Sequence, residues 1–130
     1  MKIYGHPISG PARFIFGLCK HLEIGYEPHI VDLTKGEQFA EDYNKVNPNS
    51  KVPCIVEEDG FTLFESAAIA RYLIDTKVGE SSLYPKDPKT RAQIDKVTAE
   101  IGELRGPGLA IVTARFVFPK LGKTFPPALL

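Results

Sequence analysis

The sequence predicts an α/β fold for residues 1–76, followed by the beginning of a helical region. Three observations support this. Short apolar runs alternate with amphipathic segments of helical period in the order β-α-β-α-β-β-α. An Asp59-Gly60 pair between two of the runs is typical of a tight hairpin turn. After Asp87-Pro88, a pair typical of a helix start, a long helical pattern begins with no further strand pattern among its residues.

The composition is ordinary for a globular domain, and it excludes several classes of partner. Sixteen Lys and Arg residues balance sixteen Asp and Glu residues, so no net charge draws the chain to nucleic acid or an anionic membrane. No apolar run approaches the roughly 18 residues of a membrane span, and no signal-peptide core is evident. Neither the two cysteines nor the three histidines have metal-site spacing. We therefore expect Cys19 and Cys54 to be buried free thiols in a cytoplasmic protein without a metal.

The N-terminal segment predicts a parallel βαβ unit. Residues 2–4 form a short strand, and Ser9 followed by Pro11 is typical of a helix start. Residues 26–31 form the second strand, which should run parallel to the first because a helix connects them. Residues 36–43 then predict a short, polar helix, exposed and close to a site.

The stretch from residue 46 to residue 73 carries the features that point to chemistry. Val52-Pro53 leads into a strand over 54–56, Asp59-Gly60 forms a two-residue turn, residues 61–64 return, and Glu65-Ser66 opens a helix. A cis bond at Pro53 would leave the Val52 backbone free to pair with an extended ligand. Ser66 at the N-cap could hold a ligand carboxylate, and Glu65 an ammonium group. The alternative is that Ser66 only caps its helix and Pro53 only begins an edge strand.

The run NPNSKVPCIVEEDGFTLFESAAIARYL resembles the glutathione-binding half of the cytosolic glutathione transferases, and residues 1–76 match that half from end to end. The serine-type theta and phi classes fit best. The resemblance implies a thioredoxin-like domain with a mixed four-stranded sheet over residues 1–78 and a linker over 79–87. Residues 88–130 would be a truncated all-helical domain, consisting of its first long helix and a tail. A homodimer is also implied.

The resemblance implies that glutathione is the co-substrate and that Ser9 activates its thiol. Serine-type members carry such a serine four residues before an arginine, as Ser9 stands before Arg13. Lowering a thiol pKa from about 8.5 by two units requires about 2.7 kcal/mol. A charge-assisted hydrogen bond of roughly 1.5–3 kcal/mol and a helix N-terminus worth roughly 0.3–1 kcal/mol can supply this. Tyr4, the residue type that other classes use, and Cys19 do not stand at the matching position.

The other glutathione contacts follow from the same resemblance. Lys51 and Val52 fall where the family contacts the peptide backbone of glutathione, Val52 through its main chain. Glu65 and Ser66 fall where the γ-glutamyl end is held. Gln38 stands near the glycyl carboxylate, at a position that is often histidine; glutamine can donate a hydrogen bond there but carries no charge.

The helical pattern after Asp87 is predicted to break or kink at Gly106-Pro107-Gly108 and to resume over 109–118. A single amphipathic helix cannot bury its own apolar face, so this segment packs back on the first domain, packs on a second chain, or leaves the molecule only marginally stable. Of these we predict self-association through the segment.

Three functions fit these features. The first is a glutathione transferase, in which the bound thiolate attacks a small electrophile, as in detoxification. The second is a non-enzymatic binding or assembly module, because most of the helical domain that walls the hydrophobic-substrate site in this family is missing. The third is a glutathione-dependent redox or isomerase enzyme, for which a site cysteine is expected, so Ser9 argues against it.

Overall fold

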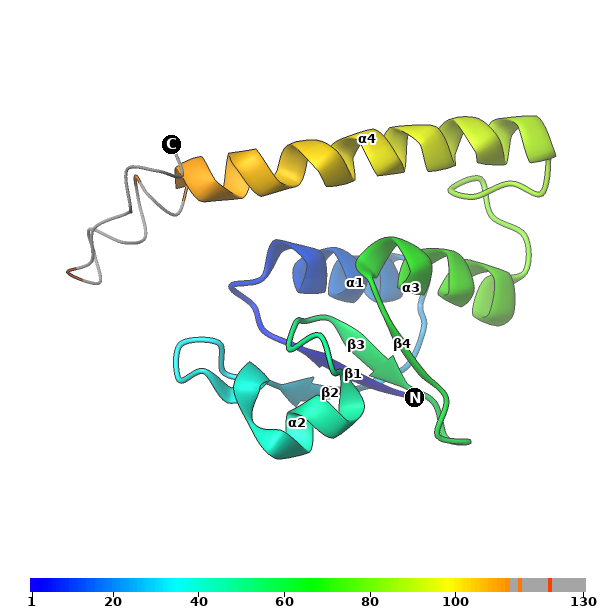
Figure 1. Cartoon of the computed structure of the whole chain (residues 1–130). Coiled ribbons are helices and arrows are strands. Elements are labelled where there is room, and N and C mark those ends of the chain that lie inside the picture. Colours follow the sequence, from blue (N-terminus) through cyan, green and yellow to red (C-terminus); the bar gives the residue numbers. More distant parts are fainter. Residues whose placement is uncertain (113–114, 116–121, 123–130) are drawn as a thin grey trace. The chain divides into compact units, whose positions relative to one another are not determined.

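The computed structural model describes residues 1–112, 115 and 122, and its contacts divide the chain into two units, Met1–Tyr84 and Pro85–Leu130 (Figure 1). The elements of the first unit are β1 (Lys2–Gly5), α1 (Gly10–His21), β2 (Glu27–Ile30), the short 3-10 helix η1 (Glu37–Phe39), α2 (Glu41–Val46), β3 (Cys54–Val56), β4 (Thr62–Phe64), α3 (Ser66–Leu73) and the π-helical turn η2 (Ile74–Val78). The second unit contains α4 (Pro88–Val112). No helix of the described residues is long and apolar enough to cross a membrane.

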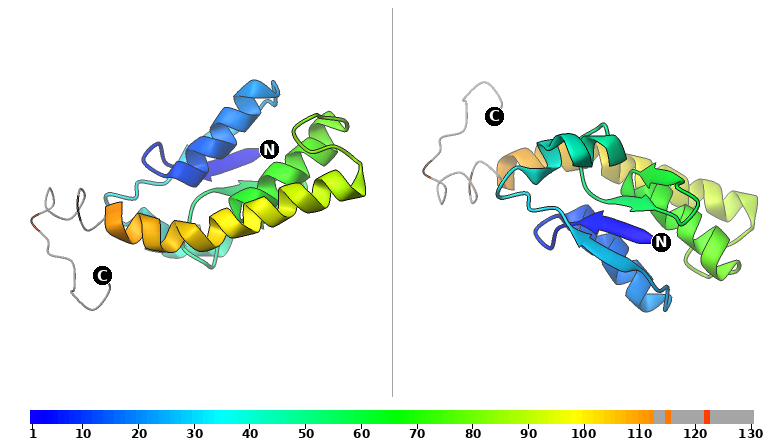
Figure 2. Two further views of the ribbon diagram at one scale, coloured as in Figure 1. Left: turned by 90° about the horizontal axis from the view of Figure 1, so that it is seen from above. Right: turned by 90° about the horizontal axis from the view of Figure 1, so that it is seen from below.

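The four strands of the first unit form one mixed sheet in the order β2-β1-β3-β4. Strands β1 and β2 are parallel, because α1 carries the chain back before β2 begins (Figure 2). Strand β3 pairs antiparallel with both β1 and β4. The predicted βαβ unit, hairpin and mixed sheet are therefore confirmed.

Helices α1 and α3 cover one face of the sheet and α2 covers part of the other (Figure 1). Alternate residues of a strand point to opposite faces, which sends Ile3 and Ile55 toward α1 and α3. These two side chains, together with Ile15, Ile69 and Leu73, are fully buried in the main core cluster. On the other face the ring of Tyr4 lies 5.9 Å from that of Tyr43, between their centroids. This contact confirms Tyr4 as a packing residue of its strand.

The hairpin between β3 and β4 differs from the predicted two-residue turn. Glu57 N–H donates to the Phe61 carbonyl at 2.9 Å, so three residues, 58–60, form the loop between this pair. Gly60 N–H donates to the Glu57 carbonyl at 3.1 Å, and Gly60 has φ 87°. A turn followed by a left-handed glycine is the usual geometry of a three-residue hairpin loop, and an Asp-Gly pair is compatible with both lengths.

The polar helix predicted over 36–43 is wrong in its bounds. Ala40 is extended, with φ −65° and ψ 144°, and this separates η1 from α2. Gly36, with φ 77°, is the N-cap of η1, and α2 continues three residues beyond the predicted end, to Val46.

The start of α4 is as predicted, and its predicted interruption is wrong. The Asp87 carboxylate accepts hydrogen bonds from the N–H and hydroxyl of Thr90, both at 2.8 Å, so Asp87 caps the helix before Pro88. The helix then continues through Gly106-Pro107-Gly108 to Val112. A proline deletes one i→i−4 hydrogen bond, and the bonds on either side of it keep the helix continuous. Of the predicted segment 109–118, residues 113–114 and 116–118 lie outside the described residues.

Candidate functional site

The sheet topology brings three of the predicted segments to one edge. Ser9 follows β1 after a short turn, and β3 runs antiparallel to β1, so Val52 just before β3 lies at the same end of the sheet. Strand β4 returns to this end and leads directly into Glu65 and Ser66. The last pair of the β3–β4 register, Cys54 with Phe64, lies two residues from Val52 on one strand and two from Ser66 on the other. We call this end of the sheet, with residues 6–9, 52–53 and 65–66, the Ser9 edge.

Ser9 is the N-cap of α1, which confirms the predicted helix start. Its side-chain oxygen accepts a hydrogen bond from the Ala12 N–H at 3.3 Å, and its backbone is extended, with φ −77° and ψ 117°. A hydroxyl that accepts through a lone pair still has its proton to donate. Because Ser9 is half-buried and no described protein group accepts that proton, the hydroxyl can donate to a ligand.

The turn that carries Ser9 is held by three hydrogen bonds. The Ser9 N–H donates to the His6 carbonyl at 2.9 Å, and the Ile8 N–H donates to His6 Nδ1 at 3.2 Å. Arg13 Nη1 donates to the Pro7 carbonyl at 3.0 Å. The spacing of Ser9 and Arg13 therefore has a local structural reason, since one helical turn places the guanidinium where it can brace the turn preceding the serine.

The main-chain groups of Val52 are unpaired within the described part of the chain. The Val52-Pro53 peptide bond is cis, and neither the N–H nor the carbonyl of Val52 has a hydrogen-bond partner among the described residues. The preceding carbonyl, of Lys51, accepts from the Tyr43 hydroxyl at 2.5 Å and from Asn47 Nδ2 at 2.7 Å. The peptide unit before Val52 is thus fixed through its carbonyl, whereas the N–H and carbonyl of Val52 itself remain available to a ligand.

Asn47 was not among the site residues predicted from the sequence. Its side chain is 1% exposed, and besides its bond to Lys51 it accepts from the Asn49 N–H at 3.0 Å. The signal in the sequence is the Asn47-Pro48 pair, because asparagine before proline favours turn initiation. Nothing in the local pattern indicates that the same side chain reaches the carbonyl of Lys51.

The N-cap of α3 is one residue earlier than predicted. Glu65 is the N-cap of α3 and Ser66 is its first helical residue, so the interpretation of Ser66 as the N-cap is wrong. The reason is the backbone of Glu65, whose φ of 71° turns the chain from β4 into the helix. The first N–H groups of a helix have no intrahelical partner, and the Ser66 N–H and hydroxyl have none among the described residues either. Both groups are therefore available to a carboxylate.

Replacing Glu65 with glycine tests this backbone. Glycine tolerates a positive φ, whereas a residue with a Cβ at such a position is strained by roughly 1–2 kcal/mol. We expect the free energy of unfolding of Glu65→Gly, measured by denaturant titration, to be about 1 kcal/mol higher than that of Glu65→Ala. Both variants lose the carboxylate, so both should bind a ligand ammonium group more weakly than the wild type. A more stable alanine variant would contradict this account of the turn.

Gln38 lies in η1, after the loop that leaves β2 at the same end of the sheet as Ser9. Asp32 orders this loop by accepting from the N–H and hydroxyl of Thr34 at 2.9 and 2.6 Å, and the hydroxyl bond is the main cause that lowers the pKa of Asp32 to about 2. The amide oxygen of Gln38 is buried and has no hydrogen-bond partner in the described chain. No described contact joins Gln38 to the other predicted residues, so the topology alone associates it with the Ser9 edge.

The two cysteines are buried free thiols, as predicted. Burial raises the pKa of both Cys19 and Cys54 to about 11, so both are neutral near pH 7. Neither provides the low-pKa, accessible thiolate that thiol chemistry needs.

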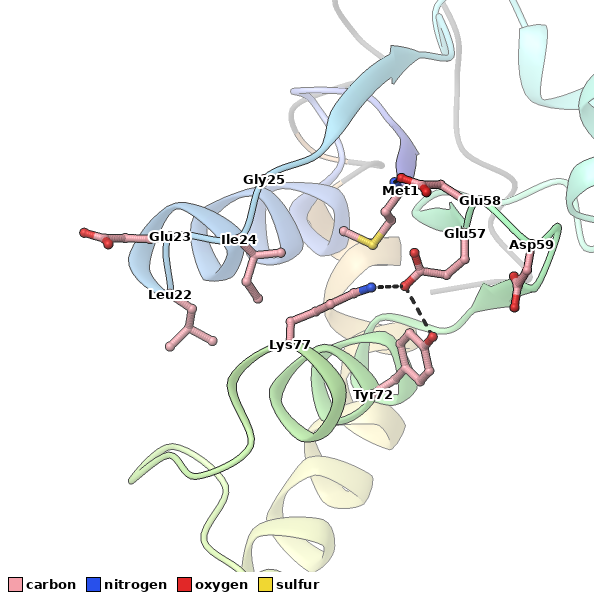
Figure 3. Close-up of a pocket in the computed structure, with 10 residues that line it drawn as sticks. All are labelled: Met1, Leu22, Glu23, Ile24, Gly25, Glu57, Glu58, Asp59, Tyr72 and Lys77. Carbon is pink, nitrogen blue, oxygen red and sulfur yellow. Dashed lines mark hydrogen bonds and ion pairs between the residues drawn. The ribbon is translucent and has the colours of Figure 1, made fainter.

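An open pocket of about 640 Å³ lies at the opposite end of the sheet, where β1 begins and α1 and α3 end (Figure 3). Met1, the loop after α1, the hairpin and the end of α3 line it, and it contains none of the predicted site residues. Inside it, Glu57 Oε1 accepts from Lys77 Nζ at 2.8 Å and from the Tyr72 hydroxyl at 3.3 Å. The bond between Lys77 and Glu57 is the main cause that raises the pKa of Lys77. The Glu57 carboxylate is thus satisfied within the protein.

Comparisons with known proteins identify the family to which this fold belongs. Residues 12–76 match the family model described as glutathione S-transferase, N-terminal domain, and the chain belongs to this family. It is 34% identical over 132 residues to glutathione S-transferase theta-1 of Mus musculus, an alignment that covers 100% of this chain and 55% of that protein. The chain therefore spans about half the length of the curated relatives it matches.

Two solved structures support the same assignment. An epsilon-class glutathione S-transferase from housefly, Musca domestica, is 36% identical, with a TM-score of 0.80 over 92% of this chain and 55% of that one. Human glutathione transferase theta-2, in complex with glutathione and an unknown ligand, is 26% identical, with a TM-score of 0.86 over 98% of this chain and 52% of that one. The predicted family and its thioredoxin-like fold are confirmed.

Proposed function

We propose that the chain binds glutathione along the Ser9 edge and activates its thiol for attack on a small electrophile. The observation that carries the proposal is the unpaired main chain of Val52, at the same end of the sheet as the Ser9 hydroxyl and the first turn of α3. A peptide lying antiparallel to Val52 would satisfy both of its groups, as a short strand does at a sheet edge. The glutathione in the human theta-2 complex supports a ligand of this class.

Each end of the tripeptide has partners in this proposal. The carboxylate of the γ-glutamyl residue accepts from the Ser66 N–H and hydroxyl at the positive end of α3, and its ammonium group pairs with Glu65. The glycyl carboxylate lies toward Lys51 and Gln38, an ammonium group and a neutral amide donor. The cysteinyl residue, held by Val52, then directs its sulfur toward Ser9.

The chemical step depends on ionisation of the bound thiol. The Ser9 hydroxyl donates a hydrogen bond to the thiolate but cannot donate one of that strength to the neutral thiol, so it lowers the thiol pKa. The first turn of α1 adds favourable potential for negative charge. The thiol proton leaves to solvent, the sulfur lone pair forms the bond to the electrophilic carbon, and the bond from that carbon to the leaving group breaks, so that an aryl halide releases halide with the bonding pair. A redox reaction is disfavoured, because the site holds a hydroxyl and both cysteines are buried with raised pKa values.

One observation favours a second candidate, a module that binds glutathione without conjugating it. The alignment with the mouse relative covers 55% of that protein. If the rest of that protein supplies the electrophile pocket, binding would survive without conjugation. In either case we propose a cytoplasmic homodimer associated through the helical segment, where α4 exposes Val97 and Ile101 to about half or more of their area.

Titration calorimetry with glutathione tests the proposal. We expect saturable binding at millimolar glutathione, and weaker binding of cysteinylglycine, which lacks the γ-glutamyl end that Glu65 and Ser66 would hold. Absence of binding at millimolar glutathione would contradict the proposal. A conjugation assay with an aryl halide on the same preparation separates the two candidates, because a protein that binds glutathione and conjugates nothing is the binding module.

A further inference from the structure

We propose that the hydroxyl of Tyr43 positions the substrate by fixing the peptide unit that carries the Val52 N–H. This inference rests on the proposed function, since it concerns how the Ser9 edge holds the cysteinyl residue of glutathione. Tyr43 touches no ligand itself. It acts through the carbonyl of Lys51, and it is therefore a positioning residue.

The geometry begins with the carbonyl of Lys51, which accepts from the Tyr43 hydroxyl and from Asn47 Nδ2 at 2.5 and 2.7 Å. A carbonyl oxygen has two lone pairs, and both are used here. The peptide bond between Lys51 and Val52 is trans, so its C=O and N–H lie in one plane and point in opposite directions. Fixing the carbonyl toward α2 therefore fixes the Val52 N–H on the side away from α2.

The two donors are themselves held in place. Tyr43 is 7% exposed and Asn47 is 1% exposed. The Tyr43 ring packs against that of Tyr4, and both Tyr43 and Asn47 belong to the segment in and directly after α2. Burial raises the pKa of the Tyr43 hydroxyl above its ordinary value, so it remains a protonated donor throughout the pH range in which a glutathione thiol titrates.

Substituting Asn47 would be a poor test of this inference, because its side chain makes a second hydrogen bond. Its side chain also accepts from the Asn49 N–H at 3.0 Å, so replacing it would disturb the turn after α2 as well as the bond to Lys51. Removing the Tyr43 hydroxyl leaves that turn and the second bond to Lys51 in place. The peptide unit then has one donor instead of two and spends less of its time in the orientation that a ligand requires.

The experiment compares Tyr43→Phe with the matched variant Tyr4→Phe. Both lose one phenolic oxygen from adjoining rings, but the Tyr4 hydroxyl has no hydrogen-bond partner among the described residues. We expect Tyr43→Phe to weaken glutathione binding by roughly 3- to 10-fold in calorimetry, the effect of one net hydrogen bond. The pKa of the bound thiol, followed by thiolate absorbance, should not change, because Ser9 sets it. Tyr4→Phe should match the wild type in both measurements.

The outcomes separate this inference from the proposed function. If the wild type binds glutathione and Tyr43→Phe binds it equally well, the inference fails and the proposed function stands. Equal weakening in Tyr4→Phe also overturns the inference, because ring packing would then be the cause. If the wild type does not bind, the proposed function itself fails.

A measurement on the wild type decides the matter if Tyr43→Phe does not fold. A bond that favours glutathione binding must, by linkage, be strengthened when glutathione binds. We expect exchange of the Tyr43 hydroxyl proton with water, followed by NMR, to slow at saturating glutathione. An unchanged exchange rate would overturn the inference.

Discussion

Replacing Ser9 with alanine is expected to raise the pKa of the thiol of bound glutathione by about one to two units. The hydroxyl is worth roughly 1.5–3 kcal/mol to a thiolate, and one pKa unit corresponds to about 1.4 kcal/mol. Conjugation near pH 7 should therefore fall to a small fraction of the wild-type rate. Affinity for glutathione should be mostly kept, because Val52, Glu65 and Ser66 hold the backbone of the tripeptide. Thiolate absorbance across a pH titration measures the pKa directly.

The control for this variant must account for the second role of Ser9. Its oxygen caps α1 through the Ala12 N–H, and losing such a cap costs about 1 kcal/mol of stability. Ser9→Thr keeps both a hydroxyl and a cap, so it should retain more of the low thiol pKa and of the stability than the alanine variant. If Ser9→Ala and the wild type show the same bound-thiol pKa, another group activates the thiol.

Replacing Ile55 with alanine is expected to cost roughly 2–5 kcal/mol in free energy of unfolding, the range for a buried isoleucine whose cavity does not collapse. Ile55 is fully buried on β3, between β1 and β4, in the cluster shared with α1 and α3. A domain of this size has about 5–15 kcal/mol in total, so the variant should be close to unfolding at 25 °C. Denaturant titration followed by circular dichroism measures the loss.

Ile30→Ala provides the matched control. It removes the same atoms from a strand of the same sheet, but Ile30 is 57% exposed on the edge strand β2. Its loss should stay within about 1 kcal/mol, the span of strand propensity. Equal losses in the two variants would contradict the assignment of Ile55 to the core.

Local patterns were sufficient to predict the four strands and the helices α1 and α3 of the first unit, but not the division between η1 and α2. Alternating apolar residues, the Ser9–Pro11 helix start and the Asp59-Gly60 turn depend on neighbours in the sequence, and the structure confirms the elements they indicate. The parallel β1–β2 pair followed from its connecting helix. The pairing of β1 with β3 joins residues about 50 positions apart, as in Ile3 with Ile55. No periodicity specifies that pairing, and only the family resemblance implied it.

The features that the sequence did not predict depend on backbone conformation and main-chain hydrogen bonds, which side-chain patterns do not encode. Glutamate is not a residue type that signals a positive φ, so the one-residue shift of the α3 start at Glu65 could not be seen. The Tyr43 hydroxyl donates to a main-chain carbonyl eight residues away, a contact that no side-chain pattern indicates. The continuity of α4 through Pro107 depends on the helical bonds on either side, whereas the residue pattern alone favours a break.

Backbone amide NMR of the wild-type chain, recorded with and without glutathione, tests the central claim most directly. If the tripeptide lies along the Ser9 edge, the amide signals of Ser9, Val52, Glu65 and Ser66 shift together and saturate with one dissociation constant. Signals that stay fixed there while those of the opposite pocket shift, in residues 22–25 and 57–59, would place the ligand at the wrong end of the sheet and contradict the account.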